Sequence, residues 1–342
     1  MAKRSSQVVS ALEYYWNKFW VNQNQIKLVV CGSAASWMIQ HVIKDKGGLH
    51  NRLTLRLPME AFNLQETQEY LNFMGIRYNT YQTLQIYMAL GGVSYYLSLL
   101  NKTLSATQNI NELCFQKKGI LLDEFSILFA SLFNESQIYE DLVTLIASKT
   151  YGIERSLIEQ KLKLKGGMLS KKLKDLEQVG FIASYQPWDR SKKGLSYKII
   201  DEYLMFYLSW IAPTAEHRIR GQFSPEFWTA QNKTGAWNAW AGICFEAICF
   251  KHIDQIRRAL HIPASSEASA WRHIEKANKS LEKSGTQIDL LFERNDDVVN
   301  LCEIKFSHDV FLLDKDTARE LKQKAETYER VTRTKKQIFI SM

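Results

Sequence analysis

The chain has 342 residues, enough for two or three domains, and its 44 Lys and Arg against 36 Asp and Glu give a formal charge of +8. This mild basic bias is compatible with nucleic acid as a partner but does not establish it. The five cysteines form no CxxC pair, which argues against a disulfide framework or a zinc site and favours a reducing, cytoplasmic setting. No apolar run reaches about 18 residues, so we expect no membrane insertion.

The N-terminal region predicts an aromatic-rich amphipathic helix at 8–20, a short buried strand at 26–31 and a second helix at 34–44. Gly32 and Ser33 connect the strand to that second helix. A small-residue turn before a helix can bind phosphate, but it is also an ordinary strand-to-helix connection. The motif GxxxxGK[ST] occurs nowhere in the chain, so no P-loop is predicted.

The segments 28–38, 53–64 and 89–97 in succession resemble the latter half of prokaryotic AAA-type ATPases. In that family a strand ending in a polar sensor residue is followed by an arginine-bearing segment and by a helical lid with a GG[IV]P-type turn. Gly91-Gly92-Val93 is similar to that turn.

The resemblance implies that Ser33 is the sensor and that Arg52 and Arg56 reach the nucleotide of a neighbouring subunit. It also implies a partial ATPase core at 1–60 and a helical lid at 61–136. The strands that carry Walker A and the acidic Walker B would precede residue 8 and are absent. We therefore expect no ATP hydrolysis by this chain alone, because that catalysis depends on positioning and charge neutralisation.

Residues 137–211 predict a winged helix. Helical periodicity and two apolar runs give its elements, which are helices at 140–148, 154–161 and 168–179 and strands at 180–185 and 195–200. Basic residues on the third helix and on the hairpin tip are expected to contact DNA phosphates: Lys165, Lys171, Lys172, Lys174, Arg190, Lys192 and Lys193. The alternative is that this unit serves protein–protein contact.

The aromatic segment 201–211 predicts a core helix that separates two domains and packs against the wing, and 212–232 predicts a linker. Beyond it, the nearly apolar segment 240–250 predicts a buried helix.

Near the C-terminus, apolar runs at 288–292 and 298–306 flank a polar cluster and predict a β-hairpin. A turn centred near residue 296 makes Asp289 and Glu303 cross-strand neighbours, and like charges there repel unless a cation neutralises them. Two carboxylates are what Mg²⁺ or Mn²⁺ needs from a protein, and Lys305 shares the face of Glu303. The alternative is an ordinary hairpin with a solvated polar face.

This arrangement resembles the PD-(D/E)XK nuclease-like superfamily, in which the Asp and the ExK lie on adjacent strands of a small mixed sheet flanked by helices. The resemblance implies that Glu246, on the preceding helix, completes the metal ligands Asp289 and Glu303. It also implies a polar or basic contact from the amphipathic helix at 317–334, with Lys322, Gln323 and Lys324 as candidates, before a strand at 337–340.

An ATPase-like part, a lid, a winged helix and a nuclease-like extension follow one another in this order in a prokaryotic family of AAA-type ATPases, which the whole chain resembles. The expected fold is thus a multidomain α/β protein with a restriction-endonuclease-like α/β/α domain at 212–342. The expected function is DNA binding with metal-dependent phosphodiester hydrolysis. The alternative is a DNA-binding or assembly protein that does not cut, as a homo-oligomer or with a separate Walker-bearing chain.

Overall fold

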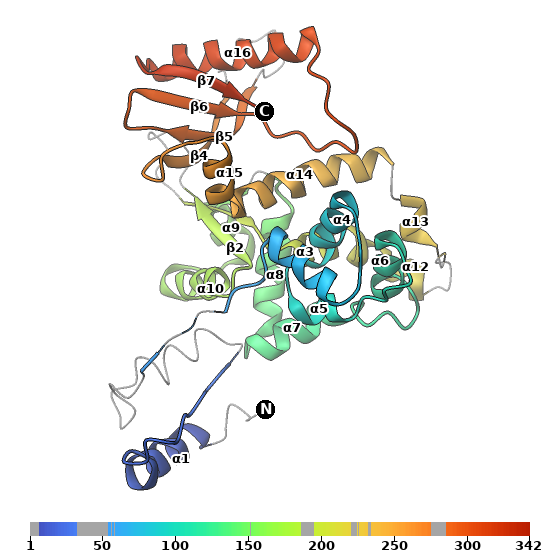
Figure 1. The fold of residues 1–342 in the computed structure, drawn as a ribbon, viewed down its shortest axis with the longest axis vertical. Helices are drawn as coiled ribbons and strands as arrows, with labels where there is room; N and C mark the ends of the chain where they lie inside the picture. Colours follow the sequence, from blue (N-terminus) through green and yellow to red (C-terminus); the bar gives the residue numbers. More distant parts are fainter. Residues whose placement is uncertain are drawn as a thin grey trace.

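The computed structural model of the chain describes residues 7–32, 54–55, 57, 59–150, 152–185, 195–219, 224, 226–231, 234–274 and 285–342. These residues form a mixed α/β structure in which helices predominate and two small sheets lie in separate parts of the molecule (Figure 1). No helix among them is both long and apolar enough to cross a membrane.

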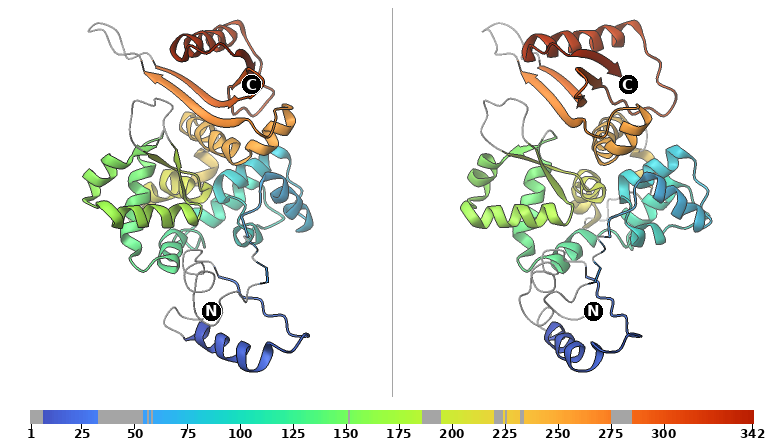
Figure 2. Two further views of the ribbon diagram at one scale, coloured as in Figure 1. Left: turned by 90° about the vertical axis from the view of Figure 1, so that its left-hand side faces the viewer. Right: turned by 60° about the vertical axis from the view of Figure 1, so that its left-hand side comes forward.

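The N-terminal helix is present as α1 (Val8–Tyr15) continuing into η1 (Trp16–Trp20), close to the predicted range. Its aromatic side chains pack on one another, for example the stacked rings of Tyr15 and Trp20. No residue of the two helices is buried, and they lie apart from the other elements (Figures 1 and 2).

The predicted buried strand at 26–31 is wrong. These residues carry no strand pairing, and the side chain of Val29 is 87% exposed. An apolar run becomes a buried strand only when neighbouring strands take up its backbone hydrogen bonds. No such neighbour occurs among the described residues.

Residues 61–136 are helical, as predicted. The helices are α3 (Leu64–Phe73), α4 (Thr80–Leu90), α5 (Ser94–Ser98), α6 (Ala106–Cys114) and α7 (Glu124–Leu132). Polar side chains fix their starts: Asn63 and Glu66 form a capping box on α3, as do Ser105 and Gln108 on α6.

The glycine pair after α4 allows a close backbone approach. Gly91 ends the helix with φ 64°, a region that favours glycine. A Cβ on Gly92 would lie 1.8 Å from the carbonyl oxygen of Phe62. The amide of Phe62 donates to the Gly92 carbonyl at 2.8 Å, so this contact ties the start of the helical region to the end of α4.

A three-stranded unit follows, with helices α8 (Ser136–Ala147), α9 (Arg155–Leu162) and α10 (Gly166–Gln178) and strands β1 (Ile153–Glu154), β2 (Ile182–Tyr185) and β3 (Ser196–Ile199). Its strands are antiparallel in the order β1-β3-β2. The predicted helices and two longer strands are present. The two-residue β1 was not predicted, because it is too short to show a periodicity.

The aromatic segment after β3 is core, as predicted, but its main neighbour is α4 rather than the β2–β3 hairpin. It comprises α11 (Glu202–Phe206) and η3 (Tyr207–Ile211). The Tyr203 hydroxyl donates to the carbonyl of Leu121 at 2.8 Å. This segment therefore packs into the same core as the preceding helices, which we call the helical body (α3 to α14).

The segment predicted as a linker is largely helical, with η4 (Ala212–Thr214), α12 (Ala215–Ile219) and α13 (Phe227–Gln231). Trp228 is 2% exposed and stacks on Phe115 at 5.6 Å between ring centroids. The next helix, α14 (Gly235–Lys251), packs on α4 and places Trp237 and Cys244 in the core of the helical body. A short helix, α15 (Ile253–Ala259), follows.

The C-terminal sheet unit contains β4 (Glu267–Ile274), β5 (Gly285–Glu293), β6 (Val298–Cys302), α16 (Lys315–Thr332) and β7 (Gln337–Ser341). The strand order is β4-β5-β6-β7, antiparallel except for the parallel β6–β7 pair. The predicted hairpin thus supplies the two inner strands of the sheet, whereas β4 and α15 were not predicted.

Helices cover both faces of this sheet (Figure 2). Tyr328 of α16 packs with Leu291 and Leu301 on one face, and Ile256 of α15 packs with Leu290 on the other. The sheet is therefore the middle layer of three, which leaves the ends of its strands as the places where charged side chains can gather.

Candidate functional site

The two inner strands bring Asp289 and Glu303 to the same end of the hairpin. Leu290 pairs with Cys302 at the end of the β5–β6 ladder. One further step in this register sets Asp289 opposite Glu303, which is the pairing expected from a turn centred at residue 296. Both side chains are buried, with 8% and 7% of their surfaces exposed.

A β-bulge interrupts β5 at Asp289. Ser269 of β4 pairs with Leu291 of β5, and Trp271 pairs with Ile288. The two pairs are two residues apart on β4 but three residues apart on β5, so β5 contains one extra residue. Ile288 and Leu291 consequently contribute to the same hydrophobic cluster beneath α16. The strict alternation used to assign faces from the sequence therefore fails at Asp289. Bulges change the direction of side chains and are frequent beside active sites.

The carboxylate of Asp289 is held by its neighbours in the sheet. Its Oδ2 accepts a hydrogen bond from the backbone amide of Ile304 at 2.9 Å, and its Oδ1 accepts a long one from Gln287 at 3.4 Å. Burial raises the pKa of Asp289, and the negative charge of Glu303 raises it further. The hydrogen bond from the Ile304 amide and the positive charge of Lys324 oppose this rise.

Glu303 lies between two lysines. Its Oε1 is 2.7 Å from the Nζ of Lys305, and its Oε2 is 2.6 Å from the Nζ of Lys324 on α16. Its backbone amide donates to the carbonyl of Ser341 at 2.9 Å. Burial lowers the pKa of Lys305, but the hydrogen bond and charge of Glu303, with the charge of Asp289, outweigh that effect and raise it.

Of the three α16 candidates, Lys324 is half-buried and reaches Glu303, whereas Lys322 and Gln323 are exposed. The sequence identified this helix as a source of a basic contact but could not choose among the three positions.

Glu246 lies on α14, half-buried, and forms no ion pair with any described residue. Burial raises its pKa to about 7, and the charge of Asp289 is the next largest cause. Glu303 raises it further, while Lys198 and Lys305 lower it. Because these groups act on one another electrostatically, Glu246 belongs to the same cluster, which we call the carboxylate site.

The fit of a metal ion to this site is incomplete in the arrangement observed. Carboxylate oxygens are the ligands that Mg²⁺ and Mn²⁺ prefer. However, both oxygens of Asp289 and both of Glu303 already accept from donors within the protein. No group of three or more His, Cys, Asp or Glu side chains in the described part of the chain is placed to hold a metal. A metal at Asp289 and Glu303 would have to displace some of these donors, such as Lys305 or Lys324 from Glu303.

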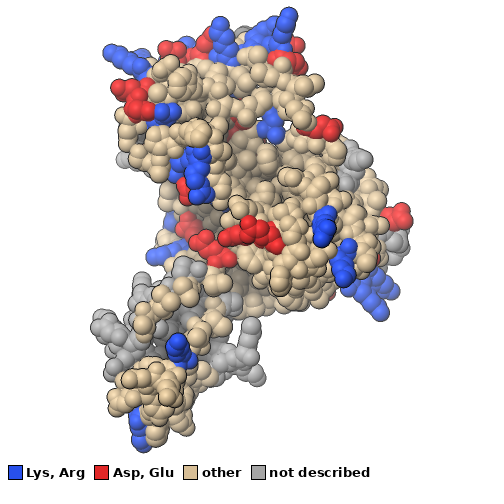
Figure 3. All heavy atoms as spheres, viewed as in Figure 1, with Lys and Arg blue, Asp and Glu red and all other residues tan. Residues whose placement is uncertain are grey.

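Three of the lysines expected to contact DNA are exposed: Lys165 precedes α10, and Lys171 and Lys174 lie on it. The end of the molecule that holds α16 is not a continuous basic face, because acidic and basic side chains lie next to one another there (Figure 3).

Lys172 does not fit the expected contact with phosphate. It is 4% exposed, its Nζ lies 2.7 Å from Glu135 Oε2, and it sits over the ring of Tyr139 at 4.5 Å. Leu169 and Leu173 are buried on the same face of α10. The spacing of three residues from Leu169 is a signal that was available in the sequence.

The remaining predicted site residues lie outside the described part of the chain: Ser33, Arg52, Arg56, Arg190, Lys192 and Lys193.

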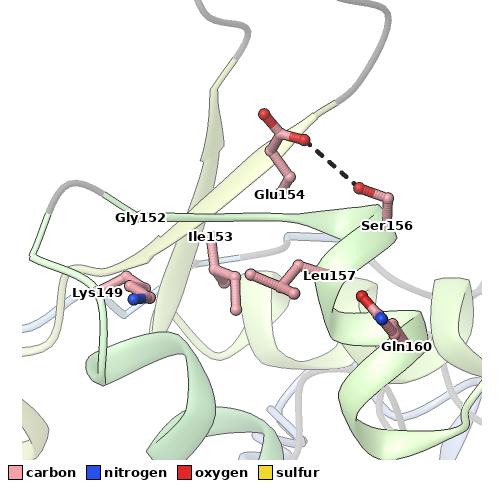
Figure 4. A pocket seen from close by; sticks show the side chains of 7 residues that line it. All are labelled: Lys149, Gly152, Ile153, Glu154, Ser156, Leu157 and Gln160. Carbon is pink, nitrogen blue, oxygen red and sulfur yellow. Dashed lines mark hydrogen bonds between the residues drawn. The ribbon is translucent and has the colours of Figure 1, made fainter.

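A shallow surface hollow lies on the three-stranded unit, and no residue of the carboxylate site lines it (Figure 4). Ile153 and Leu157 form part of its lining, and the Ser156 hydroxyl donates to Glu154 at 3.4 Å at its rim. No cluster of charged groups converges on it, so it does not compete with the carboxylate site as a centre for chemistry.

Sequence reasoning missed Lys198 on β3, whose charge acts on Glu246. A single lysine in a short strand carries no pattern that links it to a glutamate 48 residues later, so only the folded chain shows this relation.

No family model matches the chain, and no solved structure matches it. A curated protein of Methanocaldococcus jannaschii, described as "Uncharacterized protein MJECL04", is 24% identical to it over 291 residues. The similarity covers 84% of this chain and therefore includes parts of both the helical body and the C-terminal sheet unit. The chain spans 61% of the length of that relative.

Proposed function

We propose that the chain binds DNA and that its C-terminal sheet unit hydrolyses phosphodiesters with Mg²⁺ or Mn²⁺ at the carboxylate site. The observation that carries the proposal is the meeting of two buried carboxylates, Asp289 and Glu303, beside Lys305 where the pairing of the two inner strands ends. Burying two carboxylates together is costly, and one of their partners, Lys305, is partly exposed and can be exchanged for a ligand, which favours a chemical role.

In the mechanism we propose, Asp289 and Glu303 hold the metal and Glu246 completes its ligands. A bound Mg²⁺ or Mn²⁺ would lower the pKa of water and neutralise phosphate charge. Lys305, whose side chain is 40% exposed, is free to turn from Glu303 towards the phosphate and to stabilise the charge that develops there. The amide of Ile304 fixes the orientation of Asp289.

The three-stranded unit supplies the proposed DNA contact. Its element order, α8-β1-α9-α10-β2-β3, is that expected of a winged helix, and α10 carries exposed Lys171 and Lys174. Cations on one helix give affinity for the phosphate backbone without reading sequence. Lys172 is excluded from this set because it is buried.

The test is cleavage of plasmid and linear DNA by the purified chain with Mn²⁺, compared with Asp289→Asn and Lys305→Ala. Removing a ligand or a charge-stabilising group should lower the rate about 100-fold or more. Asp296→Asn is the matched control, because Asp296 is exposed at the tip of the same hairpin and pairs with Arg294. Cleavage retained in both Asp289→Asn and Lys305→Ala would sink the proposed site.

A second function has one observation in its favour. Every oxygen of Asp289 and Glu303 has a donor within the protein, and Lys324 supplies a positive charge where a metal would otherwise be needed. In this alternative the C-terminal unit grips DNA without cutting it. DNA binding that survives Asp289→Asn, with no product at any Mn²⁺ concentration, would favour it.

The resemblance to AAA-type ATPases adds a third proposal, assembly with a separate chain that bears Walker motifs. The exposed apolar side chains of Val29, Leu55 and Leu57 are compatible with a partner surface there. ATP hydrolysis should then occur only in the mixture, and hydrolysis by this chain alone would contradict the proposal.

A further inference from the structure

Lys198 lies where the three-stranded unit meets α14. Its Nζ sits over the ring of Phe250 at 4.2 Å from the centroid, and the ring of Tyr185 on the neighbouring strand is 5.9 Å away. Lys198 is on β3, whereas Phe250 is on α14, so the contact joins segments far apart in the sequence. The ribbon views show strands β2 and β3 on the side of the helical body that faces the C-terminal unit (Figures 1 and 2).

Phe250 connects Lys198 to the carboxylate site. The ring packs in one cluster with Leu290, the neighbour of Asp289, and with Ile304, whose amide binds Asp289. Glu246 lies four residues before Phe250, which puts the two on the same face of α14. Lys198 and the carboxylate site therefore share Phe250 as a neighbour, on the face of the sheet opposite to α16.

Lys198 is half-buried, yet it forms no ion pair with any residue that the structure describes. Burial lowers its pKa, and the charge of Glu246 opposes this effect. A cation held over two aromatic rings without a carboxylate in contact keeps its donors free. Such a group is suited to an anionic ligand that arrives from solution.

We propose that Lys198 is a phosphate-binding residue of the carboxylate site, contributed by the three-stranded unit, and that it holds a backbone phosphate of the DNA at that site. This inference rests on the proposed DNA-binding function. It adds that the site is shared between two units: the C-terminal sheet supplies the carboxylates, and the β2–β3 hairpin supplies a cation that positions the substrate.

The test uses the full chain, a short fluorescent DNA duplex and EDTA, with the dissociation constant measured by anisotropy over a series of KCl concentrations. Lys198→Met removes the charge while keeping a side chain that packs on Phe250. It should weaken binding roughly tenfold and reduce the steepness of log K against log salt by about 0.9, the effect of one lost phosphate contact. Lys198→Arg should restore both.

Lys102→Met is the control, because it removes the same single positive charge from an exposed lysine in the turn between α5 and α6. It should leave the slope unchanged. A wild-type slope in Lys198→Met, even with a lower melting temperature, would overturn the inference and leave Lys198 a packing residue. Failure of the wild-type chain to bind the duplex would overturn the proposed function as well. If Lys198→Met lowers the slope of log K against log salt but the wild-type chain cleaves no DNA, the inference is supported and the hydrolytic proposal is overturned.

Discussion

Glu202 in the helical body and the pair Asp289 and Glu303 at the carboxylate site are buried carboxylates that differ in what surrounds them. In the helical body Asp201 caps α11 by accepting from the amide of Leu204 at 2.8 Å. Glu202 beside it is 3% exposed and binds Lys251 through Oε2 at 2.8 Å. At the carboxylate site Asp289 and Glu303 are similarly buried, but they lie where the pairing of β5 with β6 ends.

The difference is the access that each group leaves to a ligand. Glu202 lies against Gly91, where even a Cβ would come within 3.0 Å of Oε2, and its Oε1 has no hydrogen-bond partner among the described residues. Glu303 binds two lysines, one of which, Lys305, reaches solvent. Burial of a carboxylate therefore does not by itself indicate a site. An enclosed carboxylate stabilises or strains the fold, whereas one beside an exposed cation can exchange its partner.

The largest expected effect is on the enclosed group. Lys251→Met removes the ionic partner of Glu202 and should lower the free energy of unfolding by about 3 kcal/mol at neutral pH, because a buried charge is left unpaired. Burial already raises the pKa of Glu202, so the loss should shrink at acidic pH as the carboxyl takes up a proton. Urea denaturation at two pH values measures this. An equal loss at both would contradict an unpaired Glu202.

Gly91→Ala tests how closely Glu202 is enclosed on the side that faces Gly91. The residue has φ 64°, and the added Cβ would lie 3.0 Å from Glu202 Oε2. We expect a loss of about 2 kcal/mol in stability from backbone strain and contact together. Gly242→Ala is the control, because Gly242 lies within α14 with open space around it, and alanine there should stabilise by about 0.5–1 kcal/mol.

Glu246→Gln should change how stability depends on pH. The folded pKa of Glu246, about 7, exceeds its ordinary value of 4.5, so its contribution is fully present below pH 4.5 and is lost as the pH rises through 7. The variant should equal the wild type in stability at low pH and exceed it by about 1–2 kcal/mol at pH 8, after allowance for solvent screening. Urea denaturation in EDTA at several pH values measures this. A constant difference in stability between Glu246→Gln and the wild type across this pH range would refute the prediction.

The smallest effect is expected for Lys324→Met. Glu303 keeps Lys305 as a partner, so stability should fall by less than about 1 kcal/mol. The freed Oε2 should bind Mn²⁺ more tightly, as measured by calorimetry with the full chain. Unchanged or weaker Mn²⁺ binding would show that Lys324 does not occupy the place of a metal. A stability loss as large as that of Lys251→Met would erase the distinction between the two groups.

The register of the hairpin could be predicted from the sequence. Two apolar runs separated by a polar turn allow one pairing that is symmetrical about the turn. It could not show the bulge at Asp289, which depends on how β4 packs beside β5. The strand at 26–31 failed for a related reason: an apolar run predicts burial only where partners exist.

At the level of side chains, the charges of the site were partly predictable. Asp289, Glu303 and Lys305 follow from strand positions, and the buried position of Lys172 follows from helical spacing once Leu169 and Leu173 are taken as core. Lys198 does not follow from any local pattern, because its relation to α14 arises only when two units pack together.

The helix α14 limits how this protein can be divided. Its 17 residues extend over about 25 Å, with Trp237 anchored in the helical body and Phe250 packed beneath the C-terminal sheet. Recombination that exchanged the sheet alone would leave Glu246 behind, and a junction placed before α14 would expose the surface that Trp237 covers. The two units are therefore expected to be inherited together, as one piece, rather than as interchangeable modules.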